Sequence, residues 1–172
     1  MPLRTDTFDL SGLRLSAGEG RALELGVAID PFQLGRERYR VQPAVVPTRL
    51  DISRTTGDGY ALQLRFEATL AGPCMRCLEP ALPRFAVDAR EVSQPGDVDD
   101  LDSQYVARGV LDLHAWARDT LALALPAQLL CRGECAGLCP VCGANLNGAG
   151  PTHAHEREPD SRWAKLSELK FE

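Results

Sequence analysis

The stretch YALQLRFEATLAGPCMRC, residues 60–77, joins a regular alternation of apolar and polar residues to a closely spaced pair of cysteines. The apolar side chains at its start take every second position, at Tyr60, Leu62, Leu64 and Phe66. Successive side chains of a β-strand point to opposite faces of a sheet, so this alternation predicts a strand with one buried face.

The neighbouring segments predict further strands of an antiparallel or mixed sheet. PAVVPTRLDISRT (43–55) alternates in the same way, and TGDG (56–59) is a turn signal, so the two runs predict a hairpin. PRFAVDAREVS (83–93) is typical of a returning strand. Cys74 and Cys77 would then lie at the tip between two strands.

The period of the apolar residues changes in GVLDLHAWARDTLALALP (109–126). Residues at helical spacing are Leu113, Trp116, Ala117, Thr120, Leu121 and Ala124. Asp112 is a suitable N-cap and Pro126 a suitable stop, so we predict a long helix here. Strands followed by helices indicate an α+β fold.

This pattern divides the chain into three parts. We predict an α+β core domain over residues 1–130, a Cys/His-rich zinc-binding segment over 131–158 and a C-terminal helix over 159–172. Within the core, PFQLGRERYR (31–40) predicts a loop or a single helical turn.

Composition limits the class of protein. The chain has 172 residues and a net charge of −5, which argues against broad contact with nucleic-acid phosphates. It contains no apolar run of the roughly 20 residues that a membrane span needs, and its N-terminus lacks the apolar core of a secretory signal. We therefore expect a cytoplasmic protein, whose thiols stay reduced.

Reduced cysteines at this spacing indicate metal ligands. Tetrahedral zinc takes four sulfur or imidazole ligands, and two cysteines separated by two residues can aim both sulfurs at one ion. One partition gives two sites: Cys74, Cys77, Cys131 and Cys135, and then Cys139, Cys142, His153 and His155. The alternative is a single zinc-ribbon site of Cys74, Cys77, Cys139 and Cys142. His114 is expected to be a histidine at the edge of the core.

Catalytic patterns are missing from the sequence. It contains no GxxxxGK[ST], GxGxxG or HExxH motif. The first Cys-x-x-Cys follows a strand, whereas a thiol oxidoreductase places its pair at a helix N-terminus. These features favour a structural metal site, and we predict no catalytic residue.

Three blocks of sequence, and the order in which they follow one another, resemble the YceD family of large ribosomal RNA subunit accumulation proteins. They are CMRCLEP (74–80), LDLHAWARDTLALALP (111–126) and CRGECAGLCPVCGANLN (131–147), which includes Asn145 and Asn147. Family members often end the last block with Cys-x-Cys, where this chain has His153-x-His155. The resemblance implies a bacterial ribosome-biogenesis role in large-subunit (23S) rRNA accumulation or processing. The cysteines and Arg76 carry over as elements of metal sites.

The expected partners are large-subunit ribosomal RNA or a ribosomal protein. Arg76 and Arg132, beside the cysteines, are the candidate RNA-binding residues, and the basic run of Arg36, Arg38 and Arg40 is a competing surface. The alternatives are a zinc-containing enzyme, either a ribonuclease or a thiol oxidoreductase, and a rubredoxin-like iron protein. The sequence leaves the oligomeric state open.

Overall fold

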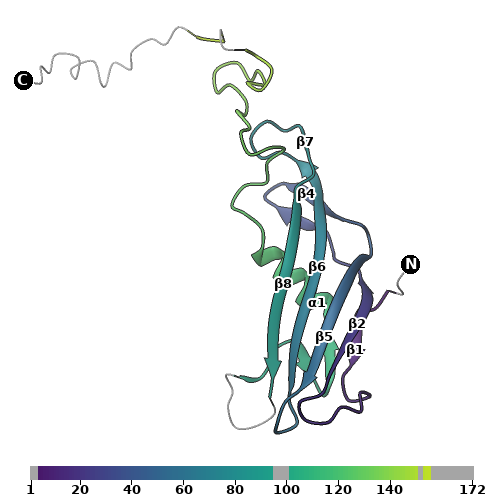
Figure 1. Cartoon of the computed structure of the whole chain (residues 1–172). Coiled ribbons are helices and arrows are strands. Elements are labelled where there is room, and N and C mark those ends of the chain that lie inside the picture. Colours follow the sequence, from purple (N-terminus) through teal and green to yellow (C-terminus); the bar gives the residue numbers. More distant parts are fainter. Residues whose placement is uncertain (1–3, 95–100, 151–152, 156–172) are drawn as a thin grey trace, which may run out of the picture.

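A computed structural model describes residues 4–94, 101–150 and 153–155. Within them, an elongated antiparallel sheet carries a helix on one face, and the cysteine-rich segment extends beyond one end of the sheet (Figure 1). The main sheet has seven strands and a smaller sheet has three.

The main sheet is built around β6 (Tyr60–Pro73), which is flanked by strands on both edges. The other strands of this sheet are β2 (Gly20–Val27), β3 (Phe32–Leu34), β4 (Glu37–Gln42), β5 (Val46–Arg54), β7 (Pro80–Ala81) and β8 (Arg84–Ser93). Because β6 is long, β5 and β4 pair with successive parts of one edge, while β8 and β7 pair with the other.

The smaller sheet lies beside the start of the helix. It contains β1 (Thr7–Asp9), β9 (Val106–Ala107) and β10 (Val110–Asp112), and α1 (Leu113–Leu123) follows β10 directly. This sheet therefore fixes the position at which the helix begins.

The core lies between α1 and one face of the main sheet. The buried residues of β6 occupy alternate positions, as predicted, at Tyr60, Leu62, Leu64, Phe66, Ala68 and Leu70. The buried residues of α1 are Leu113, Trp116, Ala117 and Leu121. The strand over 43–55, the turn over 56–59 and the antiparallel sheet are all confirmed.

The prediction of a long helix within residues 109–126 is wrong, since α1 has only 11 residues. Residues 110–112 pair as strand β10, and Asp112, the predicted N-cap, caps the helix by accepting a hydrogen bond from the Ala115 N–H at 2.8 Å. The helix ends at Leu123, two residues before the position preceding Pro126, where helical backbone is disfavoured. The helical spacing and the start after Asp112 were predicted correctly, but the helix stops earlier than predicted.

The prediction of a loop or helical turn over 31–40 is also wrong. Phe32 pairs with Tyr39 in the β3–β4 hairpin, whose turn passes through Gly35 at a φ of +64°. Tyr39 is buried, and its hydroxyl donates to the Pro73 carbonyl at 2.8 Å. That contact with β6 is distant in sequence, which is why local patterns did not indicate the hairpin.

The predicted helix over 159–172 lies outside the described residues, and the division of the chain at residue 131 stays a prediction. None of the helices in the described ranges has the length and apolar character needed to span a membrane.

Removal of the α1 cap gives a first test of the fold. Asp112→Ala should lower the free energy of unfolding by about 1 kcal/mol, because the Ala115 N–H loses its acceptor. Asp112→Asn keeps an acceptor oxygen and should stay close to wild type. Urea unfolding at constant metal content measures the difference, and equal losses in both variants would contradict this role for the side chain.

Candidate metal centres

The first candidate centre lies at the tip of the main sheet. Cys74 and Cys77 follow the end of β6, and the chain after α1 brings Cys131 and Cys135 back to them. Cys74, Cys77 and Cys135 are buried, and Cys131 is half-buried. The four sulfur atoms lie within 4.8 Å of one another.

The second candidate centre is local in sequence. Cys139 is buried and Cys142 is exposed. The sulfur atoms of these two cysteines and one ring nitrogen each of His153 and His155 lie within 4.8 Å of one another. The Cys142 Sγ lies 3.6 Å from the His153 Nε2, and the two histidine Nε2 atoms are 3.1 Å apart.

These separations suit a tetrahedral ion. Zinc–sulfur bonds of ~2.3 Å at tetrahedral angles place two sulfurs about 3.8 Å apart. The Cys74 and Cys135 sulfurs are 3.7 Å apart, and those of Cys77 and Cys131 are 3.6 Å apart. A disulfide requires about 2.05 Å, so the thiols are free. Both groups can hold a metal ion.

Both Cys-x-x-Cys turns have the same backbone geometry. The Cys74 carbonyl accepts from the Leu78 N–H at 3.0 Å, and the Cys139 carbonyl accepts from the Gly143 N–H at 2.8 Å. The residue after each second cysteine has positive φ, +64° at Leu78 and +72° at Gly143. Glycine adopts this conformation without cost, whereas leucine is strained by it.

The surroundings of the first group favour thiolates at two sulfurs. Burial raises the pKa of Cys74, but the N–H groups of Arg76, Cys77 and Cys131 outweigh it and lower the pKa to about 6. The Asn147 amide, which lies 3.4 Å from the Cys135 sulfur, lowers the pKa of that thiol. Burial and the neighbouring sulfurs raise the pKa of Cys77 to about 12.

In the second group, the N–H of Cys142 and the His153 ring lower the pKa of Cys139 to about 6. A bound divalent cation would ionise the thiols that remain protonated in either group.

Two residues that are not ligands connect the groups. Asn147 accepts from the Ala136 N–H at 2.9 Å while its amide donates to the Cys135 sulfur. Arg76 Nη1 donates to the Cys135 carbonyl at 2.9 Å, and the Arg76 carbonyl accepts from the Leu138 N–H at 3.1 Å. The sequence singled out Asn147 by resemblance alone, because its role depends on contacts that only folding creates.

The structure brings the predicted ligands together in the two groups of the two-site partition. The single zinc-ribbon alternative would need Cys74 and Cys77 with Cys139 and Cys142, and these pairs belong to different groups. Metal binding by the eight residues stays a prediction. Arg132 is exposed between Cys131 and Cys135. His114 is half-buried, and its Nε2 lies 3.3 Å from an Asp30 carboxylate oxygen.

The fold and these groups define a β-rich protein with two candidate metal centres at one end of its sheet. The family described as "Large ribosomal RNA subunit accumulation protein YceD" matches residues 62–170, and the chain belongs to this family. The matched region includes most of the central strand, the helix and all eight candidate ligands.

Curated relatives are mycobacterial. An uncharacterized protein of Mycobacterium tuberculosis is 33% identical over 171 residues, which cover 95% of this chain and 80% of the relative. An uncharacterized Mycobacterium bovis protein matches with the same identity and coverage. An uncharacterized Mycobacterium leprae protein is 30% identical over 108 residues, covering 59% of this chain and 49% of the relative. No solved structure matches the chain.

Replacing Cys131 distinguishes the two partitions. Cys131→Ser should remove about one metal ion per chain and lower the melting temperature, because the first group then has three sulfurs. Elemental analysis and a thermal melt measure both effects. Unchanged metal content and stability would instead support the single zinc-ribbon site, of which Cys131 is not a member.

Replacing both histidines tests the second group separately. His153→Ala with His155→Ala should also remove about one metal ion per chain, but the unfolding of the main sheet should change little because this group is local in sequence. Cys131→Ser is the matched comparison, since it removes an ion that connects distant parts of the chain. Full metal content in the double variant would exclude these histidines as ligands.

Proposed function

We propose that the protein is a cytoplasmic bacterial ribosome-biogenesis factor needed for accumulation or processing of large-subunit (23S) rRNA. The family match over residues 62–170 is the observation that carries this proposal. It acts by binding ribosomal RNA or a ribosomal protein, and it catalyses no reaction itself.

We propose further that both centres bind zinc in a structural role. The donor sets, Cys₄ and Cys₂His₂, are the ones that structural zinc prefers. Each group supplies four protein ligands, so a tetrahedral ion has no open position for water or substrate. This supports a non-catalytic role over a zinc-dependent ribonuclease. Elemental analysis of the native protein separates zinc from iron, and a ferric rubredoxin-like site would also be red.

The contact surface of this proposal includes Arg132 and Arg76. Arg132 is exposed between two candidate ligands, and within the described part of the chain its guanidinium forms no ion pair. Arg76 is exposed too, although one of its nitrogens donates to the Cys135 carbonyl. Metal-held loops would present both charges in a fixed geometry, which reduces the ordering cost of binding.

Depletion of the protein in its own cell tests the proposed function. The ratio of large- to small-subunit rRNA should fall, and large-subunit precursors should accumulate, because assembly of that subunit stalls. Northern blotting and quantitative sequencing measure both. An unchanged ratio without precursors would refute the assignment.

Complementation of the depleted cell tests the contact residues. Wild type and Arg14→Glu should restore the ratio, whereas Arg132→Glu should restore it less well. Arg14 is a matched control because it is exposed and makes no ion pair among the described residues. Purified protein that cleaves large-subunit RNA without other factors would favour the enzyme alternative.

A further inference from the structure

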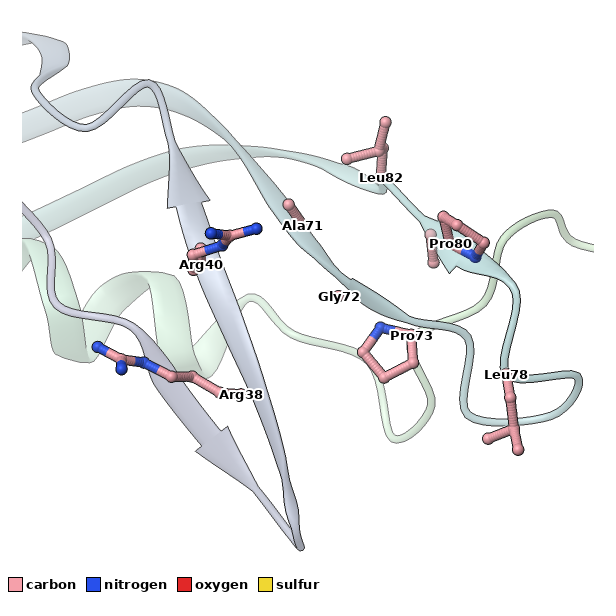
Figure 2. Close-up of a pocket in the computed structure, with 9 residues that line it drawn as sticks. Arg38, Arg40, Ala71, Gly72, Pro73, Leu78, Pro80 and Leu82 are labelled. Atoms are coloured by element: carbon pink, nitrogen blue, oxygen red, sulfur yellow. The ribbon is translucent and has the colours of Figure 1, made fainter.

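A groove lies between β4 and the hairpin that carries the first Cys-x-x-Cys (Figure 2). Its volume is about 590 Å³, which is within the range of ligand-binding clefts. Arg38 and Arg40 of β4 line one side, and Pro73, Leu78, Pro80 and Leu82 of the hairpin line the other. The candidate metal ligands lie outside this groove.

The hairpin side of the groove is apolar. Leu78 is 64% exposed and Leu82 is 62% exposed, although both are large apolar side chains. Pro73 and Pro80 have no N–H groups, so this wall offers few main-chain donors to a bound anion. Apolar side chains of a partner would pack against this wall, and negatively charged groups of the partner would be bound by the arginines.

Three other arginines on the same sheet face, which is the face opposite α1, form ion pairs. Along that face, Asp51 pairs with both Arg49 and Arg65. Arg84 pairs with Glu67. These charges are neutralised by their neighbours.

Arg38 and Arg40, in contrast, are exposed and form no ion pair with any described residue. Glu37 alternates to the other face of β4 and lines a different cleft. The positive charge at the groove is therefore available to a partner.

We infer that this groove binds an extended protein segment in which acidic and apolar side chains alternate. The carboxylates pair with Arg38 and Arg40, and the apolar side chains pack on Leu78, Leu82 and the two prolines. Successive side chains of an extended segment point to opposite sides. An alternating segment can therefore direct its carboxylates to the arginine wall and its apolar side chains to the hairpin wall. The inference does not depend on the proposed role in rRNA accumulation.

RNA fits the same groove less well. Single-stranded RNA is bound by aromatic stacking and by polar groups that read base edges. Among the described residues, no aromatic side chain lines this groove, and its polar side chains are the two arginines. The negative charge of the whole chain, −5, also opposes an extended polyanion more than a short acidic segment.

The first candidate metal centre holds one wall of the groove in place. Leu78 directly follows Cys77, and its N–H donates to the Cys74 carbonyl at 3.0 Å. Leu78 is therefore fixed in an exposed position by the turn that carries two sulfurs of that centre. A wall ordered before binding lowers the entropy cost of docking.

Fluorescence anisotropy tests the inference with three labelled probes: an octapeptide that alternates Asp and Leu, one that alternates Lys and Leu, and a uridine octanucleotide. The full-length, metal-loaded wild type should bind the Asp–Leu peptide roughly tenfold or more tightly than either other probe, because this peptide alone offers both carboxylates and apolar side chains to the groove.

Charge reversal provides the decisive comparison. Arg38→Glu with Arg40→Glu should reverse the preference toward the Lys–Leu peptide. Arg21→Glu with Arg90→Glu makes the same charge change at exposed positions near the other end of the sheet, and should leave the preference intact. Leu78→Gly should weaken Asp–Leu binding without lowering stability, because glycine tolerates the φ of +64° at this position.

Three outcomes would overturn the inference. They are no binding of the Asp–Leu peptide, an Asp–Leu preference that survives the Arg38/Arg40 reversal, and tighter binding of the uridine octanucleotide that this reversal abolishes. The last outcome would assign the groove to RNA. Circular dichroism and metal analysis of each variant exclude unfolding as the cause of lost binding.

Discussion

The meeting of two cysteine pairs at the tip of the sheet is the constraint on which the rest of the structure depends. Cys74 and Cys135 are separated by 61 residues, yet their sulfurs lie 3.7 Å apart. The chain between them forms the returning strand, two strands of the small sheet and α1, and then runs back along the main sheet to its tip (Figure 1). A metal ion in the first group would close this long loop, and closure of a long loop constrains the unfolded chain strongly.

The second group depends on the first but contributes no strand to either sheet. Its turn is anchored through the Leu138 N–H, which donates to the Arg76 carbonyl, and through Asn147, which donates to the Cys135 sulfur. Gly137, at a φ of +79°, allows the two turns to approach closely, since an added Cβ would lie 3.2 Å from the Arg76 carbonyl oxygen. The sheet tip is thus a stack of two Cys-x-x-Cys turns.

Positive charge at this tip is less neutralised than along the middle of the sheet. Ion pairs neutralise Arg49 and Arg84 of the main sheet, and pairs of this kind between exposed groups contribute little to stability. Arg38, Arg40 and Arg132 lie at or beside the tip and form no ion pairs with described residues. Positive charge is therefore available to a partner at the end of the molecule that the cysteines organise, and the sheet with α1 supports that end.

The sequence by itself determined the elements whose signals are local. Alternation predicted β5 and β6 because a half-buried strand imposes a two-residue period, and Asp112 predicted the helix start because its side chain accepts a nearby N–H. Cysteine spacing predicted the two Cys-x-x-Cys pairs as metal ligands, since a gap of two residues is enough to aim both sulfurs at one ion. The family was also evident in the order of the cysteine blocks.

Tertiary structure decided what depended on distant partners. Residues 110–112, which precede the predicted helix, formed strand β10 because β1 offered them a partner, and the β3–β4 hairpin formed where Tyr39 could reach Pro73. The choice between two four-ligand groups and one zinc ribbon also required folding. Spacing along the chain leaves both possible, and only the path after α1 places Cys131 and Cys135 beside the first pair.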